Sequence, residues 1–191
     1  MAKIIINESN MDFEFEESNL YIPEKEEFMG KLPLTSICDF IYEYKKDTIF
    51  IIEAKTGIPN FNNRRSISNF QEYKISFNGK EVPNPNKPLP EDNIHQFQME
   101  ILKKFNDTLI VYCAVILDRL KNISVNNNMK NINHLKNDIS MILVVKNLDS
   151  EYVAEWSDVF KSFMEPLKKR FSIKDTLILN ETMAKKHNLI K

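Results

Sequence analysis

The chain has 191 residues, a hydrophobic fraction of 42% and a formal net charge of −1 at pH 7. This length predicts one domain, residues 1–191, with enough apolar material for a buried core. The near-neutral charge excludes a protein that holds nucleic acid through a large basic surplus alone. No apolar run approaches the roughly 18 residues of a membrane span. We therefore expect a cytoplasmic protein that does not associate with membranes.

The N-terminal region predicts two short strands. Lys3–Ile6 is mostly apolar, and Met11–Phe15 alternates apolar residues with acids, which is typical of a strand with one buried face. We expect one of these strands to precede the following strands in a common sheet.

Two further segments, Thr35–Tyr44 and Thr48–Ala54, are rich in Ile, Phe, Tyr and Thr and are separated by three charged residues. This pattern predicts a β-hairpin. A three-residue loop would place Asp39 opposite Glu53. Because side chains alternate along a strand, Glu53 and Lys55 then share the face to which Asp39 points.

The predicted convergence of Asp39, Glu53 and Lys55 indicates a metal site. Two carboxylates at cross-strand distance repel each other unless a divalent cation lies between them. Oxygen ligands favour Mg²⁺ or Mn²⁺. A neighbouring ammonium group orients or deprotonates an attacking water, or stabilises the charge of a phosphorane-like transition state. The residues therefore predict a site that hydrolyses phosphodiester bonds.

The Glu-x-Lys pattern has little specificity by itself, since the chain contains it three times. Only Glu53-Ala54-Lys55 ends an apolar strand and has an acid placed opposite it. The competing interpretation is structural: Glu53 and Lys55 form the solvated end of a strand, and Asp39 pairs with a Lys or Arg.

Asp39, Glu53-Ala54-Lys55 and the apolar strands around them resemble the PD-(D/E)xK nuclease superfamily, with Cys38 in place of the proline. The resemblance implies an α/β fold of the restriction-endonuclease-like type, with a mixed β-sheet flanked by α-helices. It implies that Asp39, Glu53 and the main-chain carbonyl of Ala54 bind the metal and that Lys55 assists the water. Many members add an acid from the N-terminal region. The candidates here are Glu16, Glu17, Glu26 and Glu27.

A polar connection, Thr56–Glu91, follows the site and is longer than most loops. It contains Arg64, Arg65 and Lys74, which we expect to contact nucleic-acid phosphates. A solvated surface is the competing interpretation for these residues, and more so for Lys168-Lys169-Arg170.

Apolar residues at steps of three and four predict a long helix over 92–120. Gln96 lies in its first turns, and the resemblance makes it a candidate contact to a phosphate or water; a capping or surface role competes. The apolar run Thr108–Leu117 leaves open a break at Asn106-Asp107 followed by a strand.

The rest of the chain predicts a second connection over 121–137, a strand at Ile139–Lys146, an amphipathic helix at Glu151–Phe171 and a strand at Thr176–Leu179. The two cysteines, Cys38 and Cys113, are expected to be buried apolar residues and not a disulfide.

We expect Mg²⁺-dependent cleavage of DNA by an effector of a prokaryotic antiviral defence or restriction system, by analogy with such nucleases. With so little net charge, the chain would rely on an ATPase, helicase or sensor subunit, or on a homo-oligomer, to hold the DNA. Two alternatives stay open. One is a catalytically inactive nuclease-like structural or regulatory subunit, and the other is an α/β module whose helix Glu151–Phe171 docks a protein partner.

Overall fold

A computed structural model describes residues 2–25, 36–44, 48–59, 74–77, 80–83, 90–117, 119 and 138–191. Its centre is a five-stranded sheet in the order β3-β4-β5-β8-β9. The first three strands are antiparallel, and β5, β8 and β9 are parallel. The strands are β3 Leu20–Tyr21, β4 Phe40–Tyr44, β5 Thr48–Lys55, β8 Asp138–Val145 and β9 Asp175–Asn180. This confirms the predicted α/β class, a mixed sheet flanked by helices.

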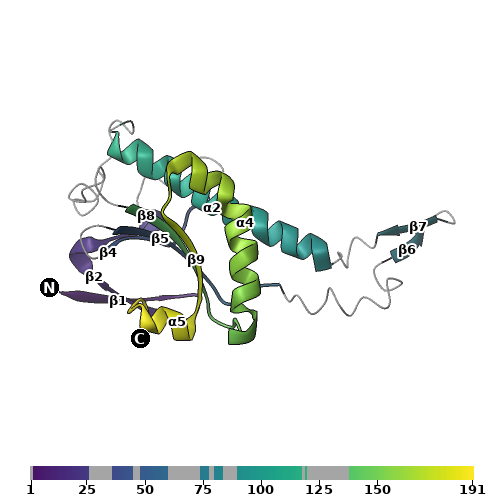
Figure 1. Cartoon of the computed structure of the whole chain (residues 1–191), viewed down its shortest axis with the longest axis horizontal. Helices are drawn as coiled ribbons and strands as arrows, with labels where there is room; N and C mark the ends of the chain where they lie inside the picture. Colours follow the sequence, from purple (N-terminus) through teal and green to yellow (C-terminus); the bar gives the residue numbers. More distant parts are fainter. Residues whose placement is uncertain are drawn as a thin grey trace.

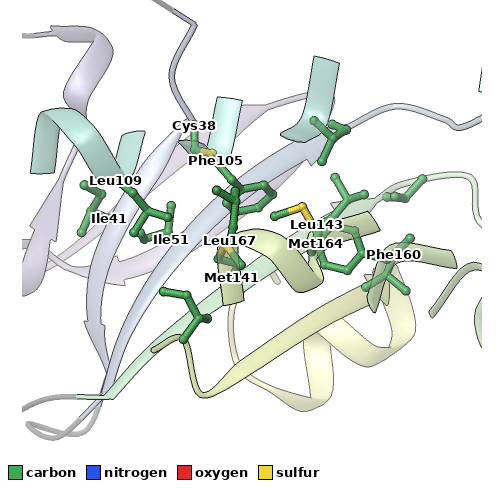
Figure 2. Close-up of a cluster of buried hydrophobic side chains, with 14 of the residues drawn as sticks. Cys38, Ile41, Ile51, Phe105, Leu109, Met141, Leu143, Phe160, Met164 and Leu167 are labelled. Atoms are coloured by element: carbon green, nitrogen blue, oxygen red, sulfur yellow. The ribbon is translucent and has the colours of Figure 1, made fainter. Parts of the chain in front are cut away.

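Two long helices, α2 Pro90–Ile116 and α4 Val153–Phe171, cover one face of the sheet (Figure 1). Strand residues Ile51, Met141 and Leu143 are buried beneath this layer. Phe105 from α2 and Phe160 from α4 pack against them (Figure 2). The apolar face predicted for the second helix is therefore part of the core.

The opposite face of the sheet is covered by a hairpin of β1 Lys3–Glu8 and β2 Met11–Glu16 and by the short helix α5 Glu181–Lys186 (Figure 1). The buried residues of β2 pack with Phe50 and Ile52 of β5 in a second core. Strand β5 is thus covered on both faces, as its nearly continuous apolar sequence predicts.

Both N-terminal strands were predicted, but the expectation that one of them belongs to the main sheet is wrong. β1 and β2 pair with each other in a separate two-stranded sheet. The outer partner of β4 is the two-residue strand β3, which no sequence pattern predicted. A strand this short is defined by tertiary contact and carries no periodic signal.

The long polar connection contains a hairpin, β6 Lys74–Phe77 with β7 Lys80–Pro83, which was not expected. Helix α2 runs without a break at Asn106-Asp107, so the alternative strand over Thr108–Leu117 is wrong. The connection at 121–137 lies outside the described residues. The described residues also include three short 3₁₀ turns, at Glu17–Asn19, Pro23–Lys25 and Ser150–Tyr152.

Cys38 lies just before β4 and is fully buried, and Cys113 is partly buried on α2. Both thiols are free, as predicted. Among the described residues, no helix has the length and apolar character needed to cross a membrane.

Candidate functional site

Asp39 lies just before β4, beside the C-terminal end of β5. The observed pairs Phe40↔Ile52 and Ile41↔Ile51 match the predicted register, and one more step places Asp39 opposite Glu53. The regular ladder ends at Phe40, and the carboxylate of Asp39 accepts a hydrogen bond of 2.7 Å from the backbone N–H of Ala54. With only 7% of its surface exposed, Asp39 takes the place that a backbone carbonyl would have in a longer ladder.

Helix α2 fixes the segment before Asp39. The Thr108 hydroxyl accepts a hydrogen bond of 2.8 Å from the Cys38 N–H, and the Asp107 carboxylate accepts one of 3.0 Å from the Ser36 N–H. The Thr108 hydroxyl also donates to the Lys104 carbonyl at 2.7 Å. The position of Asp39 therefore depends on contacts with a helix distant in sequence.

Glu53 is completely buried on the face of β5 that α2 covers. The Nζ of Lys104 lies 2.7 Å from its Oε1, and the Nζ of Lys55 lies 3.4 Å from the same oxygen. Neither oxygen has a well-aligned hydrogen bond within the described part of the chain. The Lys104 ammonium at 2.7 Å supplies the positive charge beside Oε1, and Oε2 is the oxygen that has neither a hydrogen bond nor an ion pair with any described residue.

Lys55 also forms a close ion pair with Glu100 of α2. The Lys55 side chain is 23% exposed and that of Glu100 is 50% exposed, so this pair lies on the solvent side of the site. Glu100 and Lys104 are one helical turn apart, and together they bring one acid and one base over the end of β5.

Burial dominates the electrostatics of both acids. It raises the pKa of Asp39 to about 6, and the Ala54 N–H and Lys104 oppose the shift. Burial also raises the pKa of Glu53 to about 7; the charge of Asp39 adds to it, and Lys104 and Lys55 oppose it. For Lys104, burial is the largest single influence and lowers the pKa, but the charge of Glu53, the hydrogen bond to Glu53 and the charge of Asp39 together outweigh it, so the net shift is upward. For both acids, burial therefore outweighs the stabilisation of the carboxylate by the neighbouring Lys104.

The donor set fits a small divalent cation. Asp39 and Glu53 offer two buried carboxylates, and Oε2 of Glu53 has no partner in the described part of the chain. The Ala54 carbonyl accepts a hydrogen bond of 3.0 Å from the Ser9 hydroxyl and keeps a second lone pair. Within the described ranges, no three His, Cys, Asp or Glu residues form a group that would enclose a metal. Mg²⁺ is commonly held by one or two carboxylates with water and substrate phosphates, so two acids suffice.

Two acids of the N-terminal region lie near Asp39. The negative charges of Glu8 and Glu24 raise the pKa of Asp39, which places both within electrostatic reach of the site. Among the acids suggested by sequence, the Glu16 carboxylate accepts a hydrogen bond from Asn19, and Glu17 lies in a 3₁₀ turn. The remaining two, Glu26 and Glu27, are outside the described residues.

The expected nucleic-acid contacts are only partly described. Arg64 and Arg65 lie outside the described residues, and of Lys74 only its place at the start of β6 is described. Gln96 is exposed on α2, one turn before Glu100. Sequence reasoning missed Glu100 and Lys104, although their spacing after Gln96 marks one face of the predicted helix.

A groove between α2 and α4 adjoins the site. It encloses about 500 Å³ and shares Glu100 with the ion pair of Lys55. Its apolar lining includes Leu102 and Leu167, and Arg170 supplies positive charge. One member of the basic cluster noted in the sequence is therefore close to the candidate site.

No family model, curated protein or solved structure matches the chain. The geometry of the site is therefore the basis for any functional assignment.

Proposed function

We propose that the chain is a Mg²⁺- or Mn²⁺-dependent nuclease that hydrolyses phosphodiester bonds of DNA. The observation that carries the proposal is the meeting of Asp39, Glu53 and Lys55 at the end of β5, where one buried oxygen of Glu53 has no partner among the described residues. A buried carboxylate oxygen in this state is costly unless a cation or donor completes it. The arrangement has the residue types and spacing that the PD-(D/E)xK resemblance implies.

In this proposal Asp39, Glu53 and the Ala54 carbonyl hold the cation, which when bound neutralises negative charge on the scissile phosphate. Lys55 lies at the solvent side of Glu53, where its ammonium orients the attacking water or stabilises the charge that develops on the phosphate. The hydrogen bond from the Ala54 N–H to the Asp39 carboxylate fixes the position of this carboxylate relative to the Ala54 carbonyl, and both are proposed ligands. Such fixed geometry is what hydrolysis requires of the chain itself.

The biological setting is proposed by analogy. A net charge of −1 supports a role in which DNA is presented by an ATPase, helicase or sensor subunit, or by a homo-oligomer. A prokaryotic antiviral defence or restriction effector fits that arrangement.

A second candidate is a catalytically inactive structural subunit. The ion pair of Lys104 with Glu53 favours it, because Lys104 already supplies one positive charge to the buried acid. The third reading, a module that docks a partner through the apolar face of α4, is weakened. Trp156, Phe160 and Leu167 on that face are buried in the core.

Cleavage assays test the proposal. Wild type, Asp39→Asn and Lys55→Ala are incubated with plasmid and single-stranded DNA in Mg²⁺, Mn²⁺ or EDTA. We expect cleavage by wild type only with a divalent cation and a loss of about 100-fold or more in each variant. Glu43→Gln, a partly buried acid on β4 away from the site, serves as the matched control and should retain activity. Undiminished cleavage by Asp39→Asn would rule out the proposed centre.

A further inference from the structure

Lys104 has no part in the proposed chemistry, yet it makes the shortest contact to the most buried acid of the site. Its Nζ lies 2.7 Å from Oε1 of Glu53, and its side chain is only 16% exposed. Five charged groups face each other here. They are Asp39 before β4, Glu53 and Lys55 on β5, and Glu100 and Lys104 on α2.

An ammonium and a divalent cation have the same electrostatic reason to lie beside Glu53. Each supplies the positive charge that a carboxylate removed from water needs. A bound divalent cation and the Lys104 ammonium would also repel each other at this separation. Full occupancy of both positions is therefore disfavoured.

We propose that Lys104 is a built-in counterion that competes with the divalent cation for Glu53, so that metal loading requires its ammonium to leave the carboxylate. This inference rests on the metal site of the proposed function. It makes the observed ion pair the resting state of the site, and Lys104 a positioning residue that acts through Glu53.

The surroundings of Lys104 allow the exchange. Its backbone carbonyl is fixed by the Thr108 hydroxyl, so only the flexible side chain has to move. Glu100 lies one turn earlier on the same helix, at the spacing where Glu and Lys form ion pairs. A Lys104 ammonium that moves to Glu100 would weaken the pair of Glu100 with Lys55, and so release Lys55 toward the substrate.

Mn²⁺ binding measured by calorimetry tests the competition directly. The measurement uses full-length protein at about pH 8.5, above the raised pKa values of Asp39 and Glu53. We expect Lys104→Met, which keeps the length and removes the charge, to bind Mn²⁺ at least about tenfold more tightly than wild type. Lys104→Arg keeps the charge and should bind like wild type. Lys161→Met is the control, because Lys161 lies at an exposed position of α4 and has no contact with the site among the described residues.

The outcomes separate the two proposals. Wild type that binds Mn²⁺, together with Lys104→Met that binds no more tightly, would overturn the counterion role and leave the nuclease proposal standing. Absence of Mn²⁺ binding in both proteins would overturn both. Binding by Lys104→Met alone would support the counterion role in its strongest form.

A second measurement needs no folded Lys104 variant. Lysine acylation of wild type is followed by peptide mass spectrometry with and without saturating Mn²⁺. We expect Lys104 to be protected in the metal-free protein and to be labelled several-fold faster with Mn²⁺. Asp39→Asn should show no such increase. Unchanged labelling of Lys104 in wild type at saturating Mn²⁺ would contradict the exchange.

Discussion

Burial acts on Asp39 and Glu53 in the same direction, because it favours the neutral carboxyl over the carboxylate. Their pKa values in the folded protein, about 6 and about 7, exceed the ordinary values of 3.8 and 4.5. A carboxyl with a raised folded pKa stabilises the fold below its ordinary pKa, and this contribution is lost as pH rises through the folded value. The metal-free protein should therefore lose stability between about pH 4 and pH 7.

Urea unfolding of metal-free protein at pH 5 and pH 8 measures this loss. We expect Glu53→Gln to remove a large part of it, up to about 3 kcal/mol, because the amide does not ionise. Glu43→Gln is the control and should keep the wild-type pH dependence. The assignment is wrong if wild type and Glu53→Gln show the same change in the free energy of unfolding.

The relation of Asp39 to Glu53 was predictable because it depends on local pairing. Two strands separated by three residues have few possible registers, and the alternation of side chains then fixes the face. The partners of Glu53 on the helical side were not predictable in this way. Lys104 reaches Glu53 only after α2 has docked, and no spacing in the sequence specifies that contact.

At the scale of elements, α2 does more than cover the sheet. Its Thr108 and Asp107 side chains hold the backbone at Cys38 and Ser36, and its Glu100 and Lys104 pair with the charged residues of β5. Helix α2 thus contacts both the segment before Asp39 and the charged residues at the end of β5.

The substitution Thr108→Val tests this dependence. It leaves the buried N–H of Cys38 without its acceptor, so we expect a loss of about 1 to 3 kcal/mol in the free energy of unfolding. Because Asp39 follows directly, Mn²⁺ affinity should fall as well, by about tenfold. Thr176→Val, at another buried threonine on β9, should leave Mn²⁺ affinity unchanged. Unaltered Mn²⁺ affinity in Thr108→Val would show that the helix does not position Asp39.

Elements with a strong period were predictable, and their pairing was less so. The helix α4 and the strands β5 and β8 follow from long periodic or apolar runs, whereas the second half of α2 was open between helix and strand because its apolar run fits both. The alternation in β2 predicted which of its residues are buried. It did not predict that β2 pairs with β1 in a separate sheet, because the same residues would be buried if β2 belonged to the main sheet. The long helix was the prediction, and the alternative break near Asn106 does not occur because Phe105 and Leu109 both face the core in one continuous helix.

Across the whole molecule, the 26 Lys and Arg residues are balanced by 27 Asp and Glu residues, so the local placement of basic side chains matters more than the net charge. Arg170 lines the groove between α2 and α4, and this groove reaches the site at Glu100. In the nuclease that we propose, this groove is where we expect a DNA strand to lie, because Arg170 supplies counter-charge for a phosphate beside the apolar surface.

DNA binding by Arg170→Ala, measured in Ca²⁺ at several salt concentrations, tests that role. We expect weaker binding to all sequences and a salt dependence reduced by about one ion, since one phosphate contact is lost. Lys161→Ala, at an exposed position of the same helix, is the matched control. An identical salt dependence in wild type and Arg170→Ala would place the DNA elsewhere.

The parallel pairing of β5 with β8 has a consequence for biosynthesis. Thr48 pairs with Asp138, so β5 leaves the ribosome long before its neighbour exists. Until then the backbone N–H and C=O groups along this edge of β5 have no strand beside them, and an uncovered edge of an apolar strand invites pairing with other chains. The nascent protein should therefore be most vulnerable to aggregation while β8 is still being synthesised, and a chaperone that shields this edge would raise the yield of folded product.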